Sequence, residues 1–187
     1  MSIHLVFEKS TDSTLKRIVK LLTGPHVHTE IVITATNTEK PFITRTAYSA
    51  YVDDVFSSTP ERNFGFSDST HDFLQVAASV DEMERIKNTC ESRVEVRTPY
   101  NLKDMVLSIV PFRQPVEKDI FAVKTLFCSQ AMVLILRSCL EPEHPVIHAL
   151  KPYNSRTISP SQLYTALTPV CEQAFHANIS KKGTFRV

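Results

Sequence analysis

Glycine is scarce in this sequence, and tryptophan is absent. The 187 residues include 3 glycines, and these do not form a glycine-rich run. A P-loop and a dinucleotide-binding fingerprint both need closely spaced glycines, because the backbone must approach the phosphates. We therefore exclude nucleotide-driven chemistry of these two kinds.

The chain also lacks an excess of charge and a long hydrophobic run. Lysine and arginine number 21 against 20 acidic residues, so we expect no nucleic-acid partner. The longest apolar stretch, 131–136, is far shorter than the ~20 residues of a membrane-spanning helix. The first residues lack the basic start and apolar run of a secretory signal. We expect a cytoplasmic protein.

The four cysteines, Cys90, Cys128, Cys139 and Cys171, lie far apart, and none forms a C-x-x-C pair. Hydrophobic residues make up 42% of the chain, enough to bury a core without a disulfide framework. The length suits one domain, so we predict a single domain over residues 1–187 with free thiols.

Apolar periodicity and turn signals predict segregated strands and helices, which indicates an α+β fold. Strands are expected over 2–7, 26–34, 42–52 and 72–79, with a turn at 36–40 and a polar connection at 56–69. Helices are expected from Leu15 to the Gly24-Pro25 stop and over 79–90, 101–109, 125–140 and 159–167. The predicted caps are Asp12 or Ser13, Ser79 with Glu82, and Ser159 with Gln162.

Cys128 lies in the first turn of the helix expected over 125–140, the most apolar of the chain. Unpaired N–H groups and the positive end of the helix dipole stabilise a thiolate there, so we expect a lowered thiol pKa. The same N–H groups can donate to an oxyanion. The alternative is that Cys128 packs as a small hydrophobe, as we expect of Cys139.

His28 and Glu30 form the second candidate feature. Alternate residues of a strand share one face about 7 Å apart, so this pair can line one wall of a cleft. A histidine near Cys128 would accept the thiol proton, and a polar third residue would hold its tautomer. The alternative is a solvated strand face.

A metal site is a third interpretation, because His26, His28 and Glu30 are expected on the same strand face. A tetrahedral or open metal site normally needs a further ligand or closely matched geometry. Pro145 argues against a regular helix that presents both His144 and His148. We therefore predict no metal and no cofactor.

The order of these segments resembles that of a known superfamily. His28-Thr29-Glu30 comes early, Tyr100-Asn101 precedes a short helix, Phe127-Cys128-Ser129-Gln130 opens an apolar helix, and 154–164 follows. This pattern is similar to the circularly permuted branch of the NlpC/P60 papain-like superfamily, which includes bacterial YiiX-like and poxvirus proteins. The resemblance covers residue 15 to about residue 167, and the scarcity of glycine departs from the usual pattern.

The resemblance implies a papain-like antiparallel sheet packed against a central buried helix. It makes Cys128 the nucleophile and His28 the base. Glu30 would be the third catalytic residue, and Tyr100 would approach the substrate or the oxyanion. Relatives can carry the third residue on the following strand, where 44–46 offer no carboxylate here.

These features lead to two functional hypotheses. The first is a thiol hydrolase or acyltransferase that forms an acyl-enzyme from an amide or ester. The substrate would be a peptide or a lipid, and a lipid substrate would imply peripheral membrane contact. The second is a catalytically silent interaction or virion-associated protein on the same scaffold. A viral origin would place the protein in the host cytoplasm or the virion.

Overall fold

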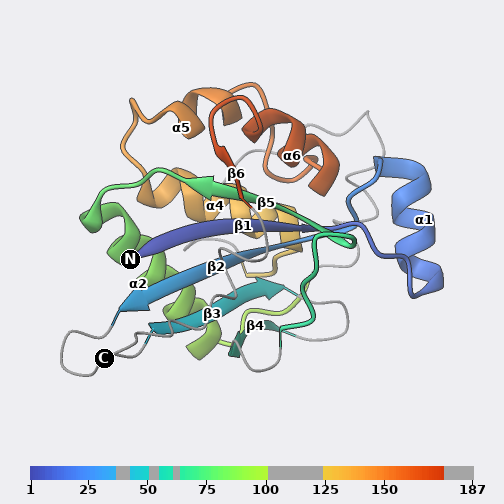
Figure 1. The fold of residues 1–187 in the computed structure, drawn as a ribbon, viewed down its shortest axis with the longest axis horizontal. Coiled ribbons are helices and arrows are strands. Elements are labelled where there is room, and N and C mark those ends of the chain that lie inside the picture. Colours follow the sequence, from blue (N-terminus) through green and yellow to red (C-terminus); the bar gives the residue numbers. More distant parts are fainter. Residues whose placement is uncertain (37–42, 51–54, 61–63, 101–123, 175–187) are drawn as a thin grey trace, which may run out of the picture.

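A six-stranded antiparallel sheet forms the centre of the fold (Figure 1). The computed structural model describes residues 1–36, 43–50, 55–60, 64–100 and 124–174. The strand order is β4-β3-β2-β1-β5-β6, and every neighbouring pair is antiparallel. The strands are β1 (Ser2–Glu8), β2 (His28–Thr36), β3 (Ile43–Ala50), β4 (Phe56–Pro60), β5 (His71–Val76) and β6 (Glu172–Ala174).

Five helices of the described residues pack around this sheet. Helix α4 contacts β2 and β3 and also touches α2, α5 and α6. Figure 1 shows α1 standing at one end of the sheet. The predicted α+β class is confirmed. The helices are α1 (Thr14–Thr23), α2 (Val80–Glu95), α4 (Cys128–Cys139), α5 (Pro145–Leu150) and α6 (Pro160–Leu167).

The two faces of the sheet are covered differently. Because side chains alternate along a strand, the odd-numbered residues of β1 and β2 share one face. That face, which includes Leu5 and Ile31, joins the buried residues of α4 in the main core. On the opposite face Val6, Val32 and Phe73 form a smaller cluster, against which Phe66 packs.

The predicted helix boundaries are confirmed where a capping residue marks them. Ser13 accepts the N–H of Lys16 at 3.2 Å, and α1 ends at Gly24, which has a φ of 106°. Glycine reaches this region of backbone space at little cost. Capping boxes open α2 at Ser79 and α6 at Ser159.

Several elements differ from the expectation. The polar segment 56–69 contains β4, and the three-residue β6 was not expected. Pro145 opens an unexpected helix, α5, as its first residue; His144 is the N-cap and only His148 lies within the helix, so the helix does not contain both histidines, as expected. Proline suits this position because the first helical N–H needs no partner. The helix expected over 101–109 and most of the turn at 36–40 lie outside the described residues.

Helix α4 begins at Cys128 rather than at residue 125, and β2 begins at His28 rather than at His26. Among the helices that the structure describes, none has the length and apolar character to cross a membrane.

The core predicts a contrast between two identical substitutions. Leu74 on β5 is fully buried, whereas Leu21 on α1 is 86% exposed. Leu74→Ala should lower the free energy of unfolding by about 2–5 kcal/mol, because it removes buried methyl groups and leaves a cavity. Leu21→Ala should change it by less than about 0.5 kcal/mol. Urea unfolding measures both, and equal losses would contradict this packing.

Candidate functional site

Cys128 is the first residue of α4, and its side chain faces the beginning of β2. Phe127 is the N-cap and makes no side-chain hydrogen bond, so the helix start is not closed by a polar cap. Backbone groups of Thr29, Ser129 and Cys128 itself hydrogen-bond to the sulfur and favour its thiolate form. The bond from Thr29 places the sulfur next to the residue that follows His28.

Burial nevertheless determines how the Cys128 thiol titrates. The residue is 3% exposed, and burial raises its pKa to about 11, with the charge of Glu30 acting in the same direction. The three backbone hydrogen bonds oppose this shift without cancelling it. The expected lowering of the thiol pKa by the helix start is therefore wrong. The sulfur is protonated at neutral pH, so it needs a base before it can act as a nucleophile.

His28 is the first residue of β2, and its ring is held by the neighbouring strand β3. Its Nε2 lies 3.0 Å from the hydroxyl oxygen of Ser49, and that hydroxyl donates to the carbonyl of Thr29 at 2.7 Å. A serine hydroxyl has one hydrogen, so Ser49 can only accept from His28. The network thus assigns the proton of His28 to Nε2 and leaves Nδ1 as the basic nitrogen.

Burial also keeps His28 neutral. Burial lowers its pKa from 6.5 to about 4, the charge of Glu8 opposes this shift, and those of Lys16 and His71 add to it. At neutral pH His28 is therefore an uncharged imidazole. A neutral imidazole and the protonated thiol of Cys128 therefore both adjoin the short segment 28–30.

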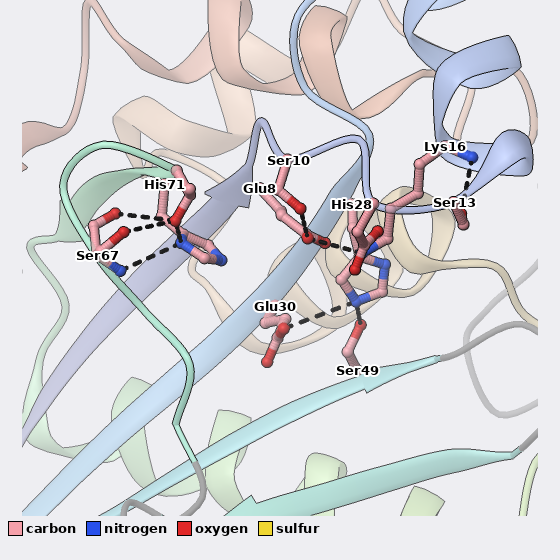
Figure 2. A network of polar contacts seen from close by, with 11 residues as sticks. Glu8, Ser10, Ser13, Lys16, His28, Glu30, Ser49, Ser67 and His71 are labelled. Carbon is pink, nitrogen blue, oxygen red and sulfur yellow. Dashed lines mark hydrogen bonds and ion pairs between the residues drawn. The ribbon is translucent and has the colours of Figure 1, made fainter.

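Two polar groups flank the Nε2 of His28 (Figure 2). A carboxylate oxygen of Glu30, which is 8% exposed, lies 3.8 Å from Nε2, so the predicted third residue does lie beside His28. Ser49 is closer, at 3.0 Å, and was not predicted. The register could have revealed it, because pairing of Ile31 with Tyr48 puts Ser49 opposite Glu30.

Tyr100 lies at the same helix start as Cys128. It forms an isolated parallel bridge with Leu126, two residues before the cysteine. Burial raises the pKa of Tyr100, and charge on Cys128 would raise it further, so the two side chains are near each other. The phenol therefore stays protonated at neutral pH.

His26 does not share a face with His28 and Glu30, so the expectation that these three residues line one face is wrong. The residue precedes β2, its Nε2 lies 2.7 Å from Asp72, and its ring packs 4.3 Å from that of Tyr164. Within the described residues, no three His, Cys, Asp or Glu side chains are grouped to hold a metal ion.

Cys139 is a buried packing residue, as expected, and Cys90 is buried in the same core. Burial raises the pKa of each thiol, and Cys139 contacts the Thr89 hydroxyl at 3.3 Å. Both serve as internal controls for Cys128.

No protein-family model matches the chain, and no curated protein matches it in sequence.

The buried imidazole predicts a specific pH dependence of stability. Between pH 6.5 and about 4 the unfolded chain protonates His28 while the folded protein keeps it neutral, so stability falls as the pH falls. In this range the free energy of unfolding of the native protein should fall with each pH unit by up to about 1.4 kcal/mol more than that of the His28→Gln variant. Urea unfolding at several pH values measures this difference. Parallel losses in the two proteins would show that His28 titrates normally.

Proposed function

We propose that this protein is a cysteine-dependent hydrolase or acyltransferase of papain-like architecture, with Cys128 as nucleophile and His28 as base. The observation that carries the proposal is the hydrogen bond from the backbone of Thr29 to the Cys128 sulfur. Thr29 directly follows His28, the proposed base, and the bonds of Ser49 assign Nδ1 as the basic nitrogen of that histidine. The chain order of a histidine strand before a cysteine helix supports the permuted architecture.

The first chemical step forms an acyl-enzyme. As the Cys128 sulfur attacks the carbonyl carbon of an amide or ester, Nδ1 of His28 takes the thiol proton. The carbonyl oxygen becomes negative, and the backbone N–H groups at the start of α4 and the phenol of Tyr100 supply hydrogen-bond donors for it. The bond to the leaving group then breaks, and His28 returns the proton to the departing nitrogen or oxygen.

The second step releases the acyl group. His28 removes a proton from water as the water oxygen attacks the thioester, and the sulfur leaves with that proton. An amine or alcohol in place of water gives acyl transfer by the same steps. Ser49 and Glu30 remain beside Nε2 of His28 during both steps and hold its ring in position.

The resting pair is uncharged in this proposal. The pKa of Cys128 is about 11 and that of His28 is about 4, so the proposed pair rests as a thiol and an imidazole rather than as a thiolate and an imidazolium. Proton transfer therefore accompanies attack on the substrate instead of preceding it. The base form of His28 is lost only as the pH falls towards about 4.

A second candidate function is that of a catalytically silent interaction protein. One observation favours it: Cys128 is 3% exposed, and burial raises its thiol pKa. A cysteine that only packs in the core has these same properties. The two candidates differ in whether the sulfur ever forms a bond to an acyl group.

Acyl-enzyme trapping distinguishes these candidates. Incubation with an activated ester such as p-nitrophenyl acetate should acetylate Cys128, as found by intact-mass measurement and peptide mapping. Cys128→Ala should abolish this modification, and His28→Ala should slow it by about 10²–10⁴-fold. Cys139→Ala is the matched control and should acylate at the native rate. Acetylation that persists in Cys128→Ala, or none in the native protein, favours the silent scaffold.

The role of Ser49 gives a separate prediction. Ser49→Ala removes the acceptor that holds the proton of His28 on Nε2, so part of the imidazole adopts the unproductive tautomer. The turnover number should fall about 10- to 100-fold, less than the ~10²–10⁴-fold effect of losing the base, while KM stays near its native value. Ser58→Ala, an exposed serine of β4, is the control. A native turnover number in Ser49→Ala would rule out this role.

A further inference from the structure

A pocket of about 330 Å³ opens on the sheet face that α4 does not cover. Residues of β1, β2, β4 and β5 and of the segment before β5 line it. One of them is Glu30, whose carboxylate lies 3.8 Å from His28, so the pocket adjoins the candidate base. The lining residues are Glu8, Glu30, Thr59, Phe64, Gly65, Phe66 and His71.

His71 supplies a hydrogen-bond donor to this pocket. Its Nδ1 accepts the backbone N–H of Ser67 at 3.3 Å and lies 2.8 Å from the Thr70 hydroxyl. The backbone donor requires an unprotonated Nδ1, so the hydrogen is on Nε2. His71 is 9% exposed, and burial lowers the pKa of its imidazole. Among the described residues Nε2 has no partner, and Figure 2 shows the ring extending towards Glu8 and Glu30.

Carboxylates and aromatic rings form the rest of the wall. Glu8 and Glu30 belong to opposing strands, and Glu8 accepts from Lys16 and from Ser10, each at 2.7 Å. Phe64 and Phe66 pack with their ring centroids 4.7 Å apart, and Phe66 also meets His71 edge-on at 5.1 Å. Carboxylates together with ring faces favour an organic cation.

We propose that this pocket binds an ammonium group with a carbonyl next to it, such as the amino-terminal residue of a peptide. The ammonium lies between the carboxylates and the phenylalanine rings, and the carbonyl oxygen accepts from Nε2 of His71. The pocket has room for a small group of this kind. That this group belongs to the substrate rests on the proposed function, and it then selects peptides with a free amine over lipids.

Binding can be measured without chemistry. The full-length Cys128→Ala protein is titrated with glycinamide as the cationic probe and followed by NMR chemical shifts. Saturable shifts should appear at residues of the pocket, and N-acetylglycinamide, which is uncharged, should give none. Glu8→Gln should weaken glycinamide binding about tenfold, as for one lost charged hydrogen bond, and Phe66→Ala should also weaken it.

Glu143→Gln is the matched control, because Glu143 is an exposed carboxylate on a loop before α5. When Glu143→Gln is added to the Cys128→Ala protein, the affinity for glycinamide should not change. Equal binding of the neutral probe, or unchanged affinity in Glu8→Gln, overturns the proposal.

Turnover by the native protein separates this inference from the proposed function. Esters with a free amino group should be cleaved at least about tenfold faster than their N-acetylated forms, by the charged contact above. Equal cleavage rates for the free-amine and N-acetylated esters would contradict the proposed ammonium site but leave the proposed hydrolase activity supported. Glycinamide binding without cleavage of either ester would support the proposed ammonium site and contradict the proposed hydrolase activity.

Discussion

The hydroxyl of Ser49 makes the two hydrogen bonds on which the candidate site depends. It donates to the carbonyl of Thr29 and accepts from Nε2 of His28, so it ties β3 to the beginning of β2 and sets the imidazole proton. The backbone of Thr29 also bonds to the Cys128 sulfur. The proposed base and the proposed nucleophile thus both contact one segment of chain. A slip of β3 by one residue would turn Ser49 to the other face and remove both bonds.

Burial accounts for the charge states around this segment. It raises the pKa values of Cys128 and Tyr100 and lowers that of His28, so each group is held in its neutral form. Neutral groups suit a site that excludes water, because no isolated charge is left in a medium of low polarity. The chemistry proposed for the site follows from this arrangement, in which charge develops only when a carbonyl group is attacked.

Local signals in the sequence predicted much of the fold. The caps at Ser13, Ser79 and Ser159 are short-range features, and their helices begin where expected. Features that depend on tertiary contacts were missed. The strand β4 is polar in sequence and forms by pairing with β3. Cys128 has the predicted position, but burial, which the sequence does not show, reverses the expected direction of its pKa shift. Ser49 was missed because its role depends on strand register.

The most direct test of this account is the tautomer of His28, measured by long-range nitrogen–proton correlation NMR on protein labelled with nitrogen-15. The account predicts that at neutral pH the proton resides on Nε2 and that Nδ1 gives the shift of an unprotonated nitrogen. A proton on Nδ1 would contradict it, because that nitrogen could not then accept the proton of Cys128.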